Sequence, residues 1–407
     1  MKVLYLCHRI PYPPDKGDKI RAFHQVQAIA RRHEIDLFTM ADDASDLRHA
    51  PVLQQYCRQV TVARLNPRLA RVRALPYLLT RAPLTIPYFY CAELRAEVRK
   101  AVVARGYDRI FVYCSAMAQY VEPAWGISLL TDFVDVDSDK WMQYANFTRW
   151  PLAAVYRREG RALREYERRI CENSACVVVT TGREASLARQ IAEGTRVQVI
   201  PNGVDTEYFQ PAAKPAPESA PTVGFTGDMS YFPNVEAVTH FAQKVLPLIR
   251  RSVAETRFLI VGRNPGRDVR RLAETEGVEV TGFVPDVREY LARMQVAVAP
   301  FSIAAGIQNK ILEAMASGIP IVCTSRAAQG LSGEVAGAVE LADAPEKMAD
   351  TIVDLLRQPE LARSKGMQGR TRVAAEYQWE RSLGQLLQLL ENPAGQQPAP
   401  AAYSSRA

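Results

Sequence analysis

Short apolar runs recur along the first half of the chain and alternate with longer stretches in which apolar residues repeat at helical spacing. The runs, which predict buried strands, are 2–6, 34–40, 60–63, 109–113, 128–133 and 176–180. Segments such as 92–104 and 154–170 predict the helices between them. Strands that are apolar on both faces are typical of parallel sheets covered by helices. Residues 1–198 are therefore predicted to form one Rossmann-like α/β domain.

The alternation stops near residue 199 and resumes at 222. Residues 199–221 are rich in proline and small residues, which predicts an interdomain linker. Residues 222–374 repeat the strand and helix pattern, so we expect a second Rossmann-like domain. Another helical pattern covers 375–391, and residues 392–407 have the composition of a disordered tail. The predicted fold class is α/β, with two doubly wound domains.

The composition is that of a soluble globular protein, with 407 residues of which 48% are apolar and 23% charged. Only a short apolar run precedes His8 and Arg9, so the amino end lacks the apolar core of a signal peptide and we expect a cytoplasmic location. The seven cysteines show no C-x-x-C spacing, which argues against a disulfide framework and against a zinc site. They are expected to be buried thiols in a reducing compartment.

The net charge of +7 is concentrated in the first half, where residues 1–198 hold 30 Lys and Arg against 21 Asp and Glu. No zinc finger or RNA-binding signature accompanies this charge, so we expect no nucleic-acid partner. The stretch 65–89 mixes arginines with Leu, Ile, Tyr and Phe, and its prolines and Arg81 exclude a spanning helix. It fits a segment lying on the inner, anionic face of a membrane. A packed helix pair with solvated arginines fits the same residues equally well.

A glycine-containing loop leads into a helix within the stretch 299–322. The pattern is that of a strand end, a loop with Gly306, a helix with Lys310 and Glu313, and a further strand. These two side chains lie one turn apart near a helix N-terminus, where a phosphorylated ligand is held most easily. The alternative is an ordinary capped helix whose Lys and Glu are solvated.

Several separated motifs carry a family resemblance that covers nearly the whole chain. They are Val199-Ile-Pro-Asn-Gly-Val-Asp-Thr206, Gly282-Phe-Val284 and the stretch Phe301–Val322. Together they resemble the family-4 retaining glycosyltransferases, which have the GT-B fold of two Rossmann-like domains facing a cleft. Three further segments resemble the exosortase-associated sugar transferases of exopolysaccharide loci: Gly227–Asn234, Val261-Gly-Arg-Asn-Pro265 and Gly306–Lys310.

The resemblance implies an activity and an arrangement of parts. It implies transfer of a sugar from a nucleotide-sugar donor to a glycan or lipid-linked acceptor, with retained anomeric configuration and without a metal or other cofactor. It also implies that the helix 375–391 returns to pack on the amino-terminal domain. Two other functions remain open: a nucleotide-sugar 2-epimerase of the same fold and a non-catalytic nucleotide-sugar-binding protein.

The resemblance also assigns donor-binding residues. Glu313 takes the place of the second glutamate of the family's E-x7-E motif, which binds ribose, whereas Ala305 stands where the first glutamate would be. Lys310 is the expected cation for the diphosphate, with Arg263 as a second cation or, alternatively, a surface turn residue. The remaining donor-binding residues are Gly17, Gly227, Phe283, Val284, Gly306, Ile307, Gln308 and Asn309.

Acidic residues alternate after the predicted strand 128–133. Asp135 and Asp137 match neither an EF-hand loop, because Lys140 occupies the position of its turn glycine, nor the fold in which D-x-D binds a metal. We expect them on the acceptor side, where many relatives have a histidine; simple helix capping is the alternative. The charged helix 156–170 is expected to be solvated and stabilised by its own ion pairs.

Overall fold

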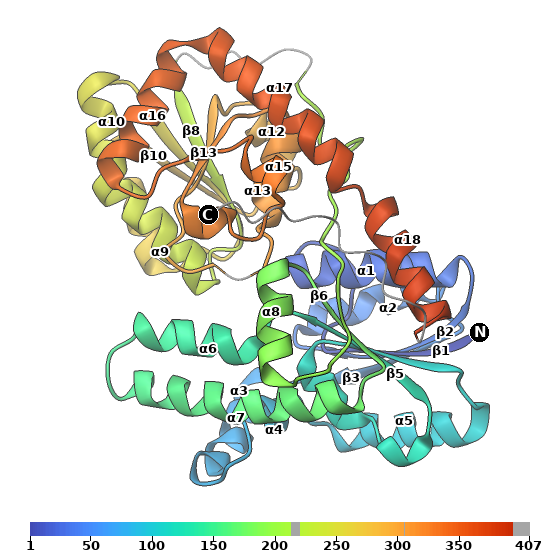
Figure 1. Cartoon of the computed structure of the whole chain (residues 1–407). Coiled ribbons are helices and arrows are strands. Elements are labelled where there is room, and N and C mark those ends of the chain that lie inside the picture. The colour runs from blue at the N-terminus through green and yellow to red at the C-terminus, as the bar shows by residue number, and fades with distance from the viewer. Residues whose placement is uncertain (213–219, 305, 394–407) are drawn as a thin grey trace. The chain divides into compact units, whose positions relative to one another are not determined.

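The computed structural model of the protein describes residues 1–212, 220–304 and 306–393. Ala305, residues 213–219 of the predicted linker and residues 394–407 of the predicted tail lie outside the described residues. The chain divides into two compact units. The first contains Met1–Pro201 and the chain from Ser382, and the second contains Asn202–Arg381. Each unit is built on its own parallel sheet (Figure 1).

The first unit contains a seven-stranded parallel sheet with the order β3-β2-β1-β4-β5-β6-β7. Its strands are β1 (Lys2–Cys7), β2 (Glu34–Ala41), β3 (Gln59–Arg64), β4 (Arg109–Tyr113), β5 (Ser128–Val134), β6 (Cys176–Val179) and β7 (Val197–Val199). The six predicted strands are present, and β7 is a further strand that ends at residue 199, where the predicted alternation stops. With only three residues, β7 is too short to show a periodicity.

Helices cover both faces of the first sheet because its strands are apolar on both faces. Val3 and Tyr5 pack with Phe23 of α1 and Leu386 of α18, whereas Leu4 of the same strand packs on the opposite face. This alternation follows from the two-residue period of a strand. The helical elements of this unit outside the segment 67–88 are α1 (Gly17–Ala30), η1 (Ala44–His49), α2 (Ala50–Leu53), α5 (Ala92–Arg105), η3 (Ser115–Tyr120), η4 (Pro123–Trp125), α6 (Asp137–Asn146), α7 (Leu152–Asn173), α8 (Gly182–Ile191) and the main part of α18 (Trp379–Glu391).

Helix α7 differs from the solvated helix predicted for 156–170. Ion pairs join Arg168 to Glu165 and Glu172 on its exposed side, as expected. Glu159 and Glu167, however, are buried, and Glu159 accepts hydrogen bonds from the backbone N–H groups of residues 84 and 85. The prediction was wrong for this face, because alternating charges on a helix do not show which of them meet a buried backbone. Helix α6 packs beside α7 through Trp141 (Figure 1).

The arginine-rich stretch 65–89 folds into three short helical segments. They are α3 (Pro67–Ala74), the 3-10 helix η2 (Leu75–Leu79) and α4 (Thr85–Tyr88). In the parts of the chain that are described, every helix is too short or too polar to cross a membrane.

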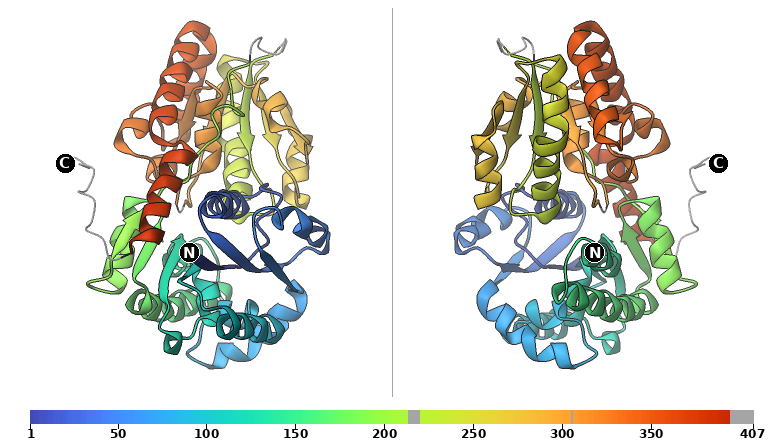
Figure 2. Two further views of the ribbon diagram at one scale, coloured as in Figure 1. Left: turned by 90° about the vertical axis from the view of Figure 1, so that its right-hand side faces the viewer. Right: turned by 90° about the vertical axis from the view of Figure 1, so that its left-hand side faces the viewer.

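The second unit contains a six-stranded parallel sheet with the order β10-β9-β8-β11-β12-β13. Its strands are β8 (Thr222–Thr226), β9 (Arg257–Val261), β10 (Val278–Gly282), β11 (Val296–Ala299), β12 (Ile321–Cys323) and β13 (Glu340–Leu341). The two-residue strand β13 was not predicted. One large apolar core surrounds this sheet, with helices on both of its sides (Figure 2).

The helices of the second unit continue the alternation. They are α9 (Phe232–His240), the π-helical turn η5 (Phe241–Val245), α10 (Leu246–Ser252), α11 (Arg267–Arg271), η6 (Leu272–Glu274), α12 (Val287–Leu291), α13 (Asn309–Ala316), α14 (Ser325–Ala328), α15 (Gly333–Ala336), α16 (Pro345–Arg357) and α17 (Pro359–Glu376). In the second sheet the order reverses between β8 and β11, and in the first it reverses between β1 and β4. The loops at such switch points diverge and leave room for a ligand.

Candidate functional site

Two glycine loops meet at the carboxyl end of β8 in the second unit. The Gly227 N–H donates to the Val261 carbonyl at 2.9 Å, which continues the pairing of β8 with β9. A Cβ atom on Gly262 would lie 1.6 Å from the Gly227 carbonyl oxygen, so no other residue fits there without a backbone shift. The glycines therefore hold these two loops in direct backbone contact.

Lys310 of α13 reaches across the switch point to this glycine loop. Its Nζ donates to Oδ1 of Asn234 at 2.6 Å and lies over the rings of Phe225 and Phe301, 4.3 and 4.7 Å from their centroids. A Cβ atom on Gly227 would lie 3.0 Å from the same Nζ. The ammonium group is thus positioned by an amide and two aromatic faces, at the point where a ligand could approach the loop backbone.

Glu313 lies one turn after Lys310 on the same helix, and both side chains are half-buried. Burial lowers the pKa of Lys310 to about 7, and the Glu313 carboxylate opposes this shift. Burial raises the pKa of Glu313 to about 7, and Lys310 opposes it in turn. Neighbouring groups with shifted pKa values at a switch point are typical of functional sites, because a bound ligand can restore the charges that burial disfavours.

Arg263 belongs to the same group of loops. Its Nε donates to Oδ2 of Asp228 at 3.0 Å, and its carbonyl accepts from the Met229 N–H at 2.9 Å. Burial opposes the ionisation of Asp228, but hydrogen bonds from Ser230 and the Arg263 guanidinium lower the pKa of that carboxyl. Arg263 is therefore anchored to the loop that follows β8, beside the loop glycine that Lys310 approaches.

The residues before α13 enter the site in different ways. Asn309 accepts a hydrogen bond at its Oδ1 from Nδ2 of the buried Asn202, at 2.9 Å. Gln308 is the N-cap residue of the helix, and Gly306 has a positive φ of 60°. The Ile307 side chain is buried in the apolar core, so only its backbone can face a ligand.

Phe283 and Val284 are not brought into this group by any contact of the described residues. They follow β10, which β9 separates from β8 in the sheet. The Phe283 side chain is 71% exposed, and Val284 packs against the core. An exposed aromatic ring at the carboxyl edge of the sheet suits stacking on a nucleotide base, which keeps the predicted role of this loop open.

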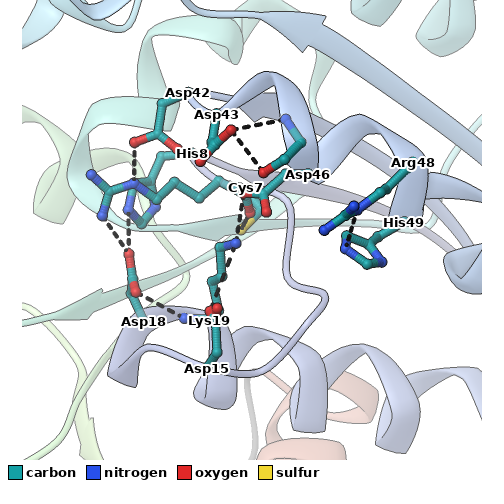
Figure 3. Close-up of polar contacts among 12 residues, drawn as sticks. Cys7, His8, Asp15, Asp18, Lys19, Asp42, Asp43, Asp46, Arg48 and His49 are labelled. Atoms are coloured by element: carbon teal, nitrogen blue, oxygen red, sulfur yellow. Dashed lines mark hydrogen bonds and ion pairs between the residues drawn. The ribbon is translucent and has the colours of Figure 1, made fainter. Parts of the chain in front are cut away.

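The switch point of the first unit carries a different set of side chains. His8 follows β1, and its Nε2 lies 3.3 Å from Oδ2 of Asp18. The same oxygen pairs with Arg9 at 2.8 Å, and Arg9 also pairs with Asp42 at 2.9 Å. Figure 3 shows His8, Asp18 and Asp42 in this cluster. Gly17, which was predicted to lie in the loop, is instead the first residue of α1, because Lys16 already has the extended conformation of an N-cap. Gly17 is exposed beside this cluster.

Two family models match the chain. The model described as glycosyl transferases group 1 matches residues 220–358, and the model described as glycosyl transferase 4-like domain matches residues 19–203. The chain is a glycosyltransferase with a 4-like domain followed by a group 1 domain. No curated protein sequence gives a significant match.

Solved structures similar to this glycosyltransferase share its GT-B fold at low sequence identity. Sucrose-phosphate synthase (tll1590) from Thermosynechococcus elongatus has a TM-score of 0.71 and 20% identity, with 96% of this chain and 98% of that chain covered. Anabaena Alr3699/HepE in complex with UDP and glucose has a TM-score of 0.68 and 16% identity, with 96% and 99% covered. A glycosyltransferase from Rickettsia africae has a TM-score of 0.65 and 12% identity, with 97% and 99% covered. The predicted fold class is confirmed.

Asp135 and Asp137 of the glycosyltransferase lie where β5 leads into α6. Asp137 Oδ2 accepts from the Ser115 hydroxyl at 2.9 Å, and Asp135 lies 3.9 Å from Lys140. Burial raises the pKa of Asp135, and Lys140 opposes the shift. Neither aspartate caps α6 through its side chain. Instead, the buried Glu184 and Glu167 accept from the backbone N–H groups of residues 136 and 138, at 2.6 and 3.0 Å.

The structure also adds residues that sequence reasoning did not place in the site of the glycosyltransferase. Asn234 and Asp228 fall within a quoted motif, but no pattern shows that they bond Lys310 and Arg263. His8 and Arg9 come two and three residues after the end of the predicted strand 2–6, and that position was the available signal. Within the described ranges, no group of three His, Cys, Asp or Glu side chains has a metal-binding arrangement.

Proposed function

We propose that this glycosyltransferase is a retaining enzyme whose nucleotide-sugar donor binds at the carboxyl edge of the second sheet. The position of Lys310 carries the proposal, because its ammonium is held by a neutral amide beside the Gly227 loop. A diphosphate gains negative charge as the bond between sugar and phosphate breaks, and a fixed cation stabilises that charge. The HepE structures with UDP and UDP-glucose support the same donor class.

The neighbouring residues take complementary roles in this proposal. Lys310 neutralises the diphosphate, with Arg263 as the second cation. Gly227 and Gly306 let backbone N–H groups approach the phosphates, and the first turn of α13 directs further N–H groups toward them. Glu313 accepts hydrogen bonds from the ribose hydroxyls. Phe283 stacks on the base, and Val284 supports the loop.

Retention follows if the leaving phosphate helps to deprotonate the acceptor hydroxyl on the face from which it departs. No dedicated protein base and no divalent metal are needed in such a step. Asp135 and Asp137 face a glycan or lipid-linked acceptor. The resemblance to exosortase-associated sugar transferases supports a place in bacterial exopolysaccharide assembly in the cytoplasm.

Residues 67–81 support peripheral binding to the inner face of the cell membrane. Leu69, Val72, Leu75 and Leu79 are exposed there, Leu79 by 94%, which is unusual for neighbouring apolar side chains. Arg68, Arg71 and Arg81 are exposed in the same segment. Apolar side chains that enter the interface and arginines that meet anionic head groups are the two components of such binding.

Arg73 is exposed in the same segment, but its guanidinium also has a structural role. It donates to the carbonyl oxygens of Pro87 and Tyr88, at 2.8 and 3.2 Å, and so ties α3 to α4. Its removal would disturb the segment itself. A test of membrane binding should therefore leave Arg73 in place.

A thermal-shift panel with UDP, GDP, ADP and CMP tests donor binding. A ligand that binds only the folded state raises its stability by RT ln(1 + [L]/Kd), so the correct nucleotide should raise the Tm of the wild-type chain. The Lys310→Ala variant should show a much smaller rise with the same nucleotide. Equal rises in both proteins, or none with any nucleotide, would contradict the proposed site.

Donor turnover separates transfer from the two remaining functions. A transferase forms product only when acceptor is added, whereas an epimerase converts the donor alone and a binding protein leaves the donor unchanged. Donor consumption that depends on acceptor, with the configuration at the anomeric carbon preserved by NMR, is the expected outcome.

A further inference from the structure

His8 and Cys114 occupy matching positions at the carboxyl edge of the first sheet. Strands β1 and β4 are parallel neighbours, and their register pairs Cys7 with Tyr113. The next residue is therefore His8 after β1 and Cys114 after β4. Neighbouring strands are about 4.8 Å apart, so an imidazole and a thiol that follow paired residues lie within reach of each other.

The His8 ring is fixed in orientation by the groups around it. It stacks on Tyr113 and meets Phe89 edge-on, with centroid separations of 5.9 and 5.6 Å. Nε2 faces the Asp18 carboxylate, which Arg9 holds in turn (Figure 3). Nδ1 is buried and makes no hydrogen bond of ordinary geometry within the described residues. Leaving a buried polar nitrogen without a hydrogen bond is unfavourable. A partner for Nδ1 is therefore expected on the side of the ring that faces away from Asp18.

Cys114 is distinguished from the other cysteines by its backbone and its exposure. It has a positive φ of 69°, which is sparsely populated by residues other than glycine, and it lies at the turn from β4 into η3. Five of the seven cysteines are buried, and Cys91 and Cys114 are the two that are partly exposed. Cys91 differs because its thiol contacts the Glu93 carboxylate at 3.0 Å.

The Cys114 thiol contributes to the pKa shift of His8. Burial alone would lower the pKa of His8, but the neighbouring Cys114 and the Asp18 carboxylate raise it to about 10. Arg9 faces Asp18 from the β1 loop, and Tyr166 of α7 faces Cys114 with a buried hydroxyl. By contrast, burial and the Glu93 carboxylate raise the pKa of Cys91.

We propose that Cys114 is a nucleophilic thiol with His8 as its proton acceptor and Asp18 as the residue that positions His8. The arrangement is a site of covalent modification by small electrophiles of the hydroperoxide class. It does not depend on the proposed glycosyl transfer. Carboxylate, imidazole and thiol in this order form the arrangement that activates nucleophilic cysteines generally.

The reaction of Cys114 with a hydroperoxide consists of proton transfer to His8 followed by attack of the sulfur. The thiol proton passes to Nδ1 of His8, and the sulfur of the thiolate attacks one peroxide oxygen. A sulfur–oxygen bond forms, the oxygen–oxygen bond breaks, and the sulfur is oxidised by two electrons to a sulfenic acid. The leaving alkoxide or hydroxide takes the proton held by His8 and departs as an alcohol or water.

Mass spectrometry of the full chain tests this proposal, with Cys91 as the internal control. After brief treatment with iodoacetamide at pH 7, Cys114 should be alkylated at least about tenfold faster than Cys91, because the thiolate is the reactive form. Its rate should change little between pH 7 and 9, whereas that of Cys91 should still rise. Hydrogen peroxide followed by dimedone should label Cys114 in preference to Cys91. Equal rates at the two cysteines, or parallel pH profiles, would overturn the proposal.

Variants separate activation from exposure. His8→Gln should lower the alkylation rate of Cys114 at pH 7 by about tenfold and restore a rise toward pH 9, with Cys91 unaffected. Asp18→Asn should shift the pH profile of Cys114 in the same direction by a smaller amount. Circular dichroism shows whether each variant is folded. If a variant is unfolded, the comparison of the Cys114 and Cys91 alkylation profiles in the wild-type chain still tests the proposal. An unchanged Cys114 rate in folded His8→Gln would contradict the role of the imidazole.

Discussion

The two sheets of this glycosyltransferase end in switch points that differ in how their cationic side chains are paired. At the first, cations are paired with carboxylates: Arg21 with Asp132 at 2.8 Å and Lys19 with Asp46 at 2.6 Å, both deeply buried. At the second, Arg263 is likewise paired with Asp228, but Lys310 bonds to an amide, and no described carboxylate lies within ion-pair distance of its Nζ. Moving an anion from water into a buried site costs desolvation free energy unless a cation in the site can pair with it.

This contrast indicates which edge can accept a diphosphate. A new anion at the first edge would compete with carboxylates that already hold the cations. At the second edge it would replace a neutral amide as the partner of Lys310 and restore a charge that burial disfavours. Similar topology thus supports two different kinds of site, and local charge pairing distinguishes them.

Removing the Lys310 charge should have the largest effect. Lys310→Ala is expected to lower kcat by about two orders of magnitude or more, since the charge that it meets grows in the transition state. Steady-state kinetics with saturating donor measure the change, and Arg263→Ala, which removes the second cation, should have the smaller effect. A variant pair in which Arg263→Ala abolishes turnover and Lys310→Ala raises only KM would reverse the assignment of the two cations.

Glu313→Ala should weaken donor binding by about 1–3 kcal/mol, the usual penalty for leaving buried polar partners unmet. Calorimetric titration of the nucleotide measures the loss. Glu313→Gln keeps the shape and part of the hydrogen bonding, so it should fall between the wild type and Glu313→Ala. If folded Glu313→Ala binds the nucleotide as tightly as the wild type does, the ribose assignment is wrong.

Charge removal in the segment 67–81 should weaken membrane binding by about tenfold. Each basic residue near an anionic surface contributes about 1 kcal/mol at most. The attraction falls off over a Debye length of about 8 Å at physiological salt, and this length shortens as salt rises. Vesicles containing phosphatidylglycerol should therefore bind the wild type less as salt rises. The variant carries Gln at Arg68, Arg71 and Arg81, and nucleotide affinity should be unchanged.

The control for this experiment carries Gln at three exposed arginines of the second unit, Arg251, Arg267 and Arg363. It changes the net charge equally without touching the segment 67–81. Binding that falls equally in both triple variants, or that ignores salt, would leave the segment without a membrane role.

Removal of divalent metal should have the smallest effect. Because protein cations and the N-terminus of α13 serve the diphosphate in this account, EDTA-treated enzyme should keep most of its rate. Initial rates before and after chelation measure this. Complete loss that manganese restores would revive a metal-binding role for Asp135 and Asp137.

The sequence predicted the fold because the strands are apolar on both faces and the helices between them have a clear period. It missed β7 and β13, whose three and two residues leave no period to detect. It also took α7 for a solvated helix, since the charges of Glu159 and Glu167 do not reveal their buried backbone partners. Such partners lie far away in sequence and become visible only in three dimensions.

The same limit applies to the site. Lys310 and Glu313 could be found because one helical turn separates them, and Gly306 because it precedes their helix. Asn234 and Asp228 could not be assigned, because their contacts with Lys310 and Arg263 span 76 and 35 residues. The pairing of His8 with Cys114 depends on the strand order of a folded sheet, which no local pattern contains.

Proton uptake on nucleotide binding is the sharpest test of the role assigned to Lys310. With a pKa of about 7, Lys310 is mostly neutral at pH 8 in the free protein, and a bound diphosphate should return its proton. Titration calorimetry at pH 8, in two buffers of different ionisation enthalpy and with the best nucleotide of the thermal-shift panel, should show uptake of most of one proton. Lys310→Arg, which stays charged, should bind without uptake. No uptake by the wild type, or equal uptake by both proteins, would contradict the account.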